Sequence, residues 1–406
     1  MLNSQKPHIG IFGKCNVGKS TFCNKFTDQI ISITSNLPGT TTDPVRKSVE
    51  LGEVGPVVLI DTAGTDDLST LSEKRIEMSL KTIPECNLAI LLISENEWDE
   101  IDHEIVGYFN KWKVPFVIIH NKSDLIPLDS KFKNDLIEKY KCDILDISSN
   151  EDLNKVSIIS LIKNNLNREF NSDTRLLGGL VHYGDLVVLV TPIDIQAPKG
   201  RLILPQVQTI RDALDHDCVV VVCKERELDL VFNLHHLKPK LVVTDSQAFL
   251  KVKGLLPSGV NLTSFSILQA RFKGHFDQLI KGTFAVEELK ANDNILILES
   301  CSHHIGGEDI GRVKIPRWLE LYKGVRLNFE FVSGMDSISK PLNSYSLVIQ
   351  CGGCMQTTTQ VNNRISPFLD NNVPVTNYGM VIAYSLGIFK QALAPFNFIN
   401  NNELYL

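Results

Sequence analysis

The stretch His8-Ile9-Gly10-Ile11-Phe12-Gly13-Lys14-Cys15-Asn16-Val17-Gly18-Lys19-Ser20-Thr21 decides the fold of the first part of the chain. Its first five residues form a short apolar run of the kind found in buried β-strands. The residues that follow match the phosphate-loop pattern G-x-x-x-x-G-K-S in the strand, loop and helix order that this loop requires. The stretch therefore predicts backbone N–H groups that bind phosphate oxygens at the start of a helix.

Single residues of this loop have distinct predicted roles. Lys19 would neutralise the β- and γ-phosphates of a nucleotide, and the Ser20 hydroxyl would coordinate Mg²⁺. The residues that we expect to bind the nucleotide here are Asn16, Val17, Gly18, Lys19, Ser20 and Thr21.

Two further motifs follow in the order typical of a small GTPase. The polar stretch Gly39-Thr40-Thr41-Thr42-Asp43 would be the first switch, with Thr41 as the residue that reaches Mg²⁺. A strand-like run at residues 57–60 then leads into Asp61-Thr62-Ala63-Gly64. Asp61 would hold the water shell of the metal, and Gly64 would donate its N–H to the γ-phosphate. The expected catalytic residues are Lys19, Thr41, Asp61 and Gly64.

A later motif indicates which base is bound. Asn121-Lys122-Ser123-Asp124 follows a strand-like run at residues 116–120. The Asp124 carboxylate can accept hydrogen bonds from N1–H and the exocyclic amino group of guanine, and adenine offers neither donor, so the site favours guanine. Ser148 and Ser149 follow the next predicted strand, where a backbone N–H would meet the guanine oxygen. We therefore expect GTP as the ligand, with the base bound by Asn121, Lys122, Asp124, Ser148 and Ser149.

The GTPase motifs lack the usual residue that orients the attacking water. Thr65 follows Gly64, Val17 precedes Gly18, and no arginine finger is evident, so intrinsic hydrolysis should be slow. Asn16 and the Gly-Thr-Thr-x-Asp switch resemble the TrmE/Era branch of GTPases. That resemblance implies a potassium ion held partly by Asn16 in place of the finger. The other interpretation of Asn16 is a solvent-facing loop residue.

Two cysteine motifs stand out in the last third of the chain. Cys301-Ser302-His303-His304 follows a strand-like run at residues 294–298, and Cys351-Gly352-Gly353-Cys354 follows another at residues 345–349. If these strands are parallel neighbours, the cysteines meet at the carboxyl edge of one sheet, where open α/β folds place ligands.

Three cysteines can be interpreted in three ways. They could complete a structural zinc site with a histidine, or hold an iron–sulfur cluster with one exchangeable position, or act in part as a redox dithiol of Cys351 and Cys354. The candidate fourth ligands are His303, His304, Glu308 and water. The spacing of the cysteines alone favours a zinc site and an iron–sulfur cluster about equally, and a redox dithiol less.

Composition limits the partners and the compartment. The chain has 406 residues and a net charge of −6, which offers no basic field for nucleic acid. Its nine cysteines are odd in number, and the amino terminus lacks a signal-peptide pattern, which favours a reducing cytoplasm. No apolar run approaches the roughly 18 residues of a membrane helix. We therefore expect a cytoplasmic protein with neither nucleic acid nor membrane as a partner.

Apolar strands that alternate with helix-like stretches predict parallel sheets beyond the first domain. Runs at residues 186–190, 218–222 and 241–243 are of this kind, and residues 265–280 have the periodicity of one helix. The expected fold class is α/β: a P-loop GTPase domain followed by two further α/β domains with mainly parallel sheets. The expected ranges are a GTPase domain at 1–168, a dimerisation domain at 175–260 and a cluster-binding domain at 261–406.

The combination of these motifs resembles the maturation GTPase of FeFe-hydrogenases, the HydF family. The resemblance implies that Cys301, Cys351 and Cys354 carry a 4Fe-4S cluster with an exchangeable fourth site. It also implies a homodimer joined through the middle domain. Such proteins act as scaffold and carrier: they receive a di-iron precursor made by radical-SAM maturases and deliver it to apo FeFe-hydrogenase. Many members have His directly before the Cys-x-x-Cys, whereas this chain has Gln350.

The leading hypothesis is thus a slow, GTP-hydrolysing scaffold that carries a metal cluster. Its cofactors would be the 4Fe-4S cluster, GTP and Mg²⁺, with K⁺ as an activating ion. The alternative is a translation- or RNA-associated GTPase with a structural zinc site, which the acidic charge balance disfavours.

Overall fold

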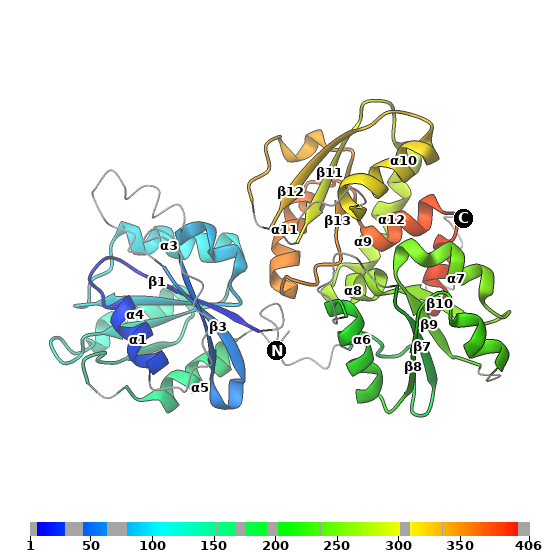
Figure 1. Cartoon of the computed structure of the whole chain (residues 1–406). Helices are drawn as coiled ribbons and strands as arrows, with labels where there is room; N and C mark the ends of the chain where they lie inside the picture. The colour runs from blue at the N-terminus through cyan, green and yellow to red at the C-terminus, as the bar shows by residue number, and fades with distance from the viewer. Residues whose placement is uncertain are drawn as a thin grey trace. The chain divides into compact units, whose positions relative to one another are not determined.

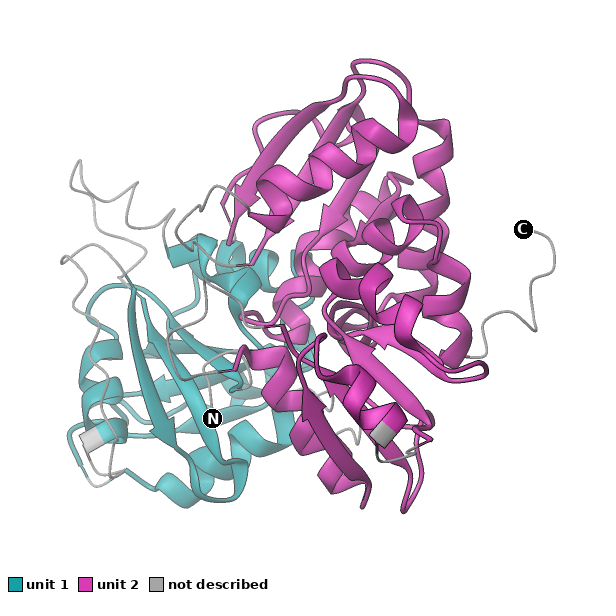
Figure 2. Cartoon of the chain, turned by 45° about the vertical axis from the view of Figure 1, so that its right-hand side comes forward, with its two compact units in different colours: residues 1–172 teal, residues 173–406 magenta. Residues whose placement is uncertain are grey.

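The computed structural model describes residues 6–28, 44–62, 79–151, 153–166, 175–192, 202–234, 238–300, 309–334 and 336–396. The chain divides into two compact units, Met1–Ser172 and Asp173–Leu406, which Figure 2 colours separately.

The first unit is built on a six-stranded sheet with the order β2-β3-β1-β4-β5-β6 (Figure 1, blue to cyan-green). Only β2 runs antiparallel to its neighbour, and the other pairs are parallel. The strands are β1 (His8–Phe12), β2 (Val45–Glu50), β3 (Pro56–Asp61), β4 (Leu88–Ser94), β5 (Phe116–Asn121) and β6 (Ile144–Asp146).

Helices cover both faces of this sheet, which explains why its central strands are apolar almost throughout. Alternate residues of β1 enter different cores: Ile9 and Ile11 pack in one, and Phe12 packs in the other. The helices are α1 (Lys19–Asp28), α3 (Glu100–Lys111), α4 (Ser130–Tyr140) and α5 (Lys155–Asn165), with short 3-10 turns η2 (Gly52–Val54) and η3 (Ile83–Glu85). Helices α1 and α5 contribute to the first core, and α3 and α4 contribute to the second.

The second unit contains two four-stranded sheets with the orders β10-β9-β7-β8 and β12-β11-β13-β14. Every strand pair in both sheets is parallel. The first sheet consists of β7 (Leu186–Val190), β8 (Val219–Cys223), β9 (Leu241–Thr244) and β10 (Asn261–Ser264). The second consists of β11 (Asn294–Glu299), β12 (Asn328–Ser333), β13 (Leu347–Gln350) and β14 (Val375–Asn377). The predicted fold class, a P-loop GTPase fold followed by mainly parallel α/β sheets, is therefore confirmed.

Helices follow most of these strands, as in βαβ units (Figure 1, green to red). They are α6 (Leu204–Asp215), α7 (Phe249–Leu255), α8 (Phe265–Lys273), α9 (Phe276–Thr283), α10 (Ile315–Lys323), α11 (Thr358–Asp370), α12 (Tyr378–Ser385) and α13 (Phe389–Leu393). Short 3-10 or π turns are η5 (Leu230–Leu234), η6 (Ser246–Ala248), η7 (Phe284–Glu288), η8 (Ile310–Lys314), η9 (Leu342–Ser344) and η10 (Ala394–Phe396).

The single helix predicted for residues 265–280 is wrong, because the chain forms two helices there. Helix α8 ends at Lys273, and α9 begins at Phe276. Between them Gly274 and His275 both have positive φ, 93° and 58°, a backbone conformation that ends an α-helix. The apolar periodicity continues across the break, and for this reason the sequence pattern did not reveal it.

Both sheets of the second unit contribute to one hydrophobic core. Val188 and Val242 of the first sheet and Ile297 and Val348 of the second belong to the same buried cluster. Residue 261, where the third domain is predicted to begin, is the first residue of β10, which pairs with β9. The predicted domain boundaries stay predictions.

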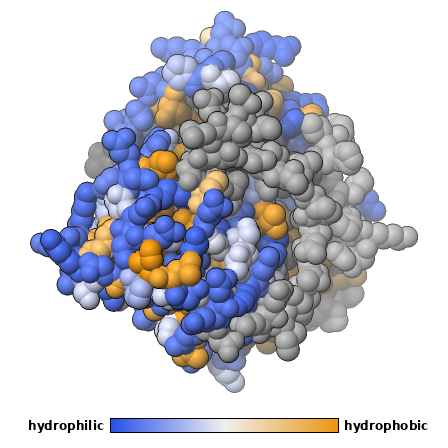
Figure 3. Space-filling view, turned by 90° about the vertical axis from the view of Figure 1, so that its left-hand side faces the viewer, coloured by the Kyte–Doolittle hydropathy of each residue, from blue (hydrophilic) through white to orange (hydrophobic). Residues whose placement is uncertain are grey.

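On the face shown in Figure 3 the described surface is mainly hydrophilic, with hydrophobic residues in small separate groups, which is ordinary for a globular protein. Among the helices that the structure describes, none is both long enough and apolar enough to span a membrane.

A close contact between α9 and β14 gives a stability prediction. A Cβ added at Gly282 would lie 2.0 Å from the backbone oxygen of Val375, so Gly282→Ala must push the helix off the strand. We expect this change to lower the free energy of unfolding of the second unit by about 1 to 3 kcal/mol. Urea unfolding, with hydrogen exchange followed in peptides from β14, measures the effect.

The matched control is Gly254→Ala in α7, because a Cβ there has nothing within 4 Å. This change should be neutral or stabilising, since alanine favours a helix over glycine by about 1 kcal/mol. Equal stabilities of the two variants would contradict the close packing of α9 on β14.

Candidate functional site

The phosphate loop connects β1 to α1, as the sequence predicts. Gly18 has φ of 93°, and a Cβ at this position would lie 2.3 Å from the side-chain nitrogen of Asn121. Only glycine meets both demands. Asn16 is exposed at the turn of the loop with φ of 63°, a left-handed conformation that asparagine tolerates well.

The Lys19 side chain is buried within the loop. Its Nζ donates hydrogen bonds to the backbone oxygens of Gly13 at 2.8 Å and Lys14 at 2.5 Å. The ammonium group is thereby held in the cradle where the loop pattern places phosphate.

Asp61 has the features of a carboxylate that serves a magnesium ion. It ends β3, directly beside β1, where Ile11 is its partner in the parallel register. Its Oδ1 is buried without a hydrogen-bond partner among the described residues. Burial raises the pKa of Asp61, and contacts with Cys23, Lys19, Lys47 and Ser20 oppose that shift. A carboxylate that has one oxygen without a described partner and that contacts the Ser20 side chain fits Mg²⁺ and its water shell.

The predicted base-binding residues come together at the ends of β5 and β6. Asn121 links the two loops, because its Nδ2 donates to the Val17 oxygen at 2.8 Å and its Oδ1 accepts from the Ser149 N–H at 2.9 Å. Ser148 Oγ donates to Asp124 Oδ1 at 2.6 Å, and this bond is the main cause that lowers the pKa of Asp124. The exposed Asp124 carboxylate is thus kept ionised as an acceptor-only group. Lys122 lies in the same loop, 3.7 Å from Glu95.

Sequence reasoning missed an ion-pair cluster beneath the phosphate loop. Lys14 Nζ lies 2.9 Å from Asp99 Oδ2 and 3.3 Å from Asp102 Oδ2, both at the start of α3. Asp102 is completely buried, and Asp99 caps the helix by accepting from the N–H groups of Ile101 and Asp102. The capping box can be recognised in the sequence, but Lys14, which pairs with it, lies 85 residues before Asp99.

The cysteine motifs follow neighbouring strands, as expected. β11 pairs in parallel with β13, with Leu298 opposite Gln350, and the Cys351 N–H donates to the Leu298 oxygen at 3.0 Å. Cys351 and Cys354 are partly exposed thiols that form no disulfide with a described residue, and they lie at the carboxyl edge of the sheet. Thiols in such a place are available to bind a metal.

A buried polar network surrounds the Cys351 sulfur. Ser300 Oγ lies 2.6 Å from Cys351 Sγ and donates to Gln356 Oε1 at 3.0 Å. Gln350 is 2% exposed; its Nε2 lies 3.4 Å from Ser300 Oγ and 3.7 Å from Cys351 Sγ, while its Oε1 has no partner among the described residues. Since the Ser300 proton is given to Gln356, the neutral thiol is the donor to Ser300. A thiolate at this position would be able to accept a hydrogen bond from Gln350, and one from Ser300 once the hydroxyl turns its proton from Gln356 to the sulfur.

Several predicted site residues lie outside the described ranges. They are Thr41, Gly64, Cys301, His303, His304 and Glu308. Within the ranges that are described, no group of three His, Cys, Asp or Glu side chains is arranged to hold a metal ion. The two described cysteines supply part of the donor set of the predicted site.

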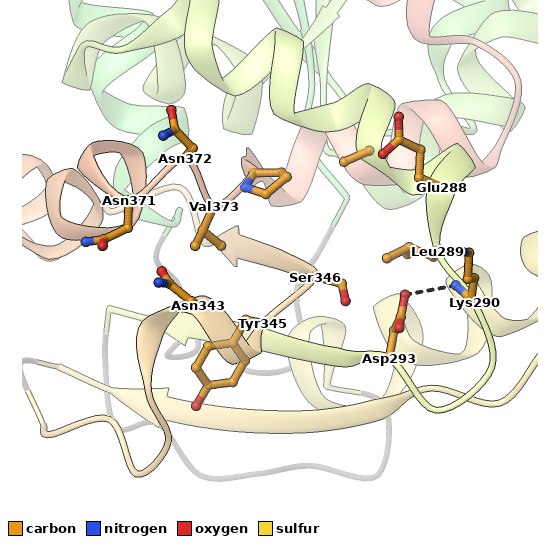
Figure 4. A pocket seen from close by; sticks show the side chains of 12 residues that line it. Glu288, Leu289, Lys290, Asp293, Asn343, Tyr345, Ser346, Asn371, Asn372 and Val373 are labelled. Carbon is orange, nitrogen blue, oxygen red and sulfur yellow. Dashed lines mark hydrogen bonds between the residues drawn. The ribbon is translucent and has the colours of Figure 1, made fainter.

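A cavity of about 450 Å³ lies at the opposite edge of the same sheet (Figure 4). Three of the residues that line it are Asp293, Ser346 and Pro374. They directly precede β11, β13 and β14, respectively. In Figure 4 the Asp293 carboxylate accepts a hydrogen bond from the Lys290 N–H at 2.9 Å. The cavity is therefore separate from the cysteine edge.

Family models match the chain in three consecutive parts. Residues 8–122 match the model described as 50S ribosome-binding GTPase. Residues 176–274 match the Hydrogen maturase F dimerization domain, and residues 277–395 match the Hydrogen maturase F tetramerization domain. The last of these ranges contains all three predicted cluster ligands.

Curated relatives include GTPases of two kinds. GTPase Der of Mycoplasmopsis pulmonis (strain UAB CTIP) is 34% identical over 183 residues, which are 41% of this chain and 41% of that protein. The tRNA modification GTPase MnmE of Mycoplasma genitalium (strain ATCC 33530 / DSM 19775 / NCTC 10195 / G37) is 35% identical over 134 residues, 33% of this chain and 29% of that protein. The match thus spans less than half the length of these relatives.

Two solved structures show weaker likeness. Era in complex with MgGDPNP and nucleotides 1506-1542 of 16S ribosomal RNA has a TM-score of 0.35 and 17% identity, covering 55% of this chain and 94% of that chain. The G domain of the T. maritima FeoB iron transporter has a TM-score of 0.33 and 17% identity, covering 40% of this chain and 99% of that chain.

The GTPase model and the two hydrogen maturase F models together account for both units of the chain. The chain therefore belongs to the hydrogen maturase F (HydF) family, the hydrogenase maturation GTPases, and carries a TrmE/Era-like GTPase domain.

Proposed function

We propose that this protein is a GTP-binding and GTP-hydrolysing scaffold that holds a 4Fe-4S cluster and delivers a di-iron precursor to apo FeFe-hydrogenase. The observation that carries the proposal is the parallel pairing of β11 with β13, which brings the Cys351-x-x-Cys354 motif to the sheet edge where the chain continues from Ser300 to Cys301. The GTPase domain in the same chain supplies a switch.

The nucleotide would be bound by its phosphates on the loop of Lys19 and Ser20, and by its base on Asn121 and Asp124. Mg²⁺ fits between Ser20 and the unpartnered oxygen of Asp61. We propose that Thr41 and Gly64 complete this site. No glutamine follows the Asp61-Thr62-Ala63-Gly64 motif, so hydrolysis is slow and suits a timer of partner exchange better than a source of energy.

The cluster would be held by Cys301, Cys351 and Cys354, with the fourth position given to His303, His304, Glu308 or water. The donor set fits, because thiolates are the usual ligands of iron–sulfur clusters and both described sulfurs are partly exposed. When bound, the cluster supplies an iron with an exchangeable coordination position. Around it, the polar groups of Ser300 and Gln350 would orient the Cys351 thiolate.

The same family membership supports the wider setting of this function. We propose a cytoplasmic homo-oligomer, with the dimer formed through the middle domain at residues 175–260 and radical-SAM maturases as the source of the di-iron cargo. The match to models of a dimerization and a tetramerization domain supports self-association of this kind.

Base recognition is tested with Asp124→Asn. The variant keeps the shape of the side chain but replaces one of its two acceptor oxygens with an NH2 donor, so it cannot accept from both guanine donors, and GTP affinity should fall roughly tenfold or more. Affinity for xanthosine triphosphate should rise, because an amide can donate to the xanthine oxygen. Titration with fluorescent nucleotides measures both constants.

A matched control is Asp135→Asn, which removes an exposed carboxylate from α4. Its GTP affinity should equal that of the wild type. Unchanged GTP affinity in Asp124→Asn would show that the base binds elsewhere.

The cluster site is tested by anaerobic reconstitution of Cys351→Ser and Cys354→Ser. Serine is a poor ligand for iron–sulfur clusters, so both variants should hold clearly less iron and sulfide than the wild type. Cys223→Ser is the control, because Cys223 is a partly exposed free thiol at the end of β8. Iron and sulfide analysis decides the outcome. Full iron content in Cys351→Ser and Cys354→Ser, or a colourless wild type with one zinc, would refute the cluster proposal.

Potassium activation is tested with Asn16→Gly, which keeps the left-handed backbone available and removes the amide. The wild type should hydrolyse GTP faster in potassium than in sodium at equal ionic strength, and the variant should lose this difference. Equal wild-type rates in the two salts would remove Asn16 from the set of ion ligands.

A further inference from the structure

A buried lysine lies beneath the Cys-x-x-Cys loop. Lys273 is 6% exposed, and its Nζ donates to the backbone oxygen of Gln356 at 2.6 Å. Its Cε lies 3.9 Å from the position that a Cβ on Gly353 would occupy, so the side chain runs directly under the loop. Burial lowers the pKa of Lys273 to about 8, while Cys354 and Cys351 act in the opposite direction.

A buried arginine lies at the same edge of the sheet. Arg364 of α11 is 7% exposed, and its two terminal nitrogens donate to the backbone oxygens of Glu299 and Val332, both at 2.5 Å. These oxygens stand at the carboxyl ends of β11 and β12. Burial lowers the pKa of Arg364, and among the opposing influences that of Cys351 is the largest.

The Glu299 carboxylate near Arg364 already forms an ion pair with a different cation. Glu299 forms a forked ion pair with Arg312, with distances of 3.0, 3.1 and 2.7 Å. In the described part of the chain, no carboxylate forms a salt bridge with Lys273 or with Arg364. Lys273 and Arg364 donate to neutral carbonyl oxygens, which complete their hydrogen bonds but do not neutralise their positive charge.

Two buried cations without a carboxylate partner are costly unless an anion binds beside them. Tyr378, Asp336 and Glu299 also act against burial on the pKa of Arg364, but the opposing influence of Cys351 is the largest. Against the effect of burial, the influences that raise the pKa of Lys273 come from the thiols of Cys354 and Cys351. A 4Fe-4S cluster held by three thiolates carries net negative charge, and reduction by one electron adds to that charge. Lys273 and Arg364 therefore complement such a group better than they complement two neutral thiols.

We propose that Lys273 and Arg364 are positioning residues that compensate the negative charge of the thiolate-held cluster and thereby retain it and raise its reduction potential. This inference rests on the proposed function. Net charge is one of the quantities that set the potential of an iron–sulfur cluster, and a nearby cation stabilises the reduced form more than the oxidised form.

The test is a redox titration of the anaerobically reconstituted full chain, followed by electron paramagnetic resonance, with iron content measured in parallel. Lys273→Met should shift the midpoint potential to more negative values or lose iron, and Arg364→Gln should do the same. The charge-retaining variants Lys273→Arg and Arg364→Lys should stay closer to the wild type than their neutral counterparts. Lys253→Met, which removes an exposed charge from α7, is the control and should leave the potential unchanged.

Circular dichroism identifies variants that fail to fold. If a variant of Lys273 does not fold, the variants Arg364→Gln and Arg364→Lys still test the inference. Wild-type potential and iron content in folded Lys273→Met or Arg364→Gln would overturn the inference while leaving the cluster in place. A wild type that binds no iron would instead refute the proposed function, and the inference would fall with it.

Discussion

The parallel pairing of β11 with β13 is the constraint on which the cysteine site depends. In a parallel sheet all strands end at the same edge, so whatever follows β11 and β13 is brought together however far apart the residues are in sequence. The hydrogen bond from Cys351 N–H to the Leu298 oxygen continues the ladder right up to the cysteine. A shift of this register would move Cys351 away from Ser300, because their contact crosses the two strand ends.

The same edge combines features that are unfavourable for an empty apolar site and favourable for an anionic ligand. Among the described residues, the buried Oε1 of Gln350 has no hydrogen-bond partner, and Lys273 and Arg364 place buried positive charge against neutral acceptors. Buried polar groups of this kind lower the stability of the fold unless a ligand compensates them. Similarly, in the GTPase unit the buried Oδ1 of Asp61 has no hydrogen-bond partner in the described ranges, and we propose that it faces a metal. Both sites carry a local cost that binding can offset.

Much of the nucleotide site could be predicted from the sequence, because each motif directly follows a strand and its geometry is local. The loop before Lys19 and the loop of Asn121 are examples, and in the structure the bond from Asn121 to Val17 joins them. The cations under the cysteines could not be predicted in this way. Lys273 is 83 residues from its partner Gln356, and Arg364 is 65 residues from Glu299, so only the folded sheet brings them together. The break between α8 and α9 was missed because hydrophobic periodicity persists through Gly274 and His275.

Mössbauer spectroscopy of the anaerobically reconstituted full chain tests the central claim most directly. That claim is that Cys301, Cys351 and Cys354 hold a cluster of which one iron has no cysteine ligand. The account predicts the spectrum of a 4Fe-4S cluster in which one iron differs from the others and changes its signal when cyanide is added. A spectrum without a cluster, or cysteines saturated by a single zinc ion, would contradict the account.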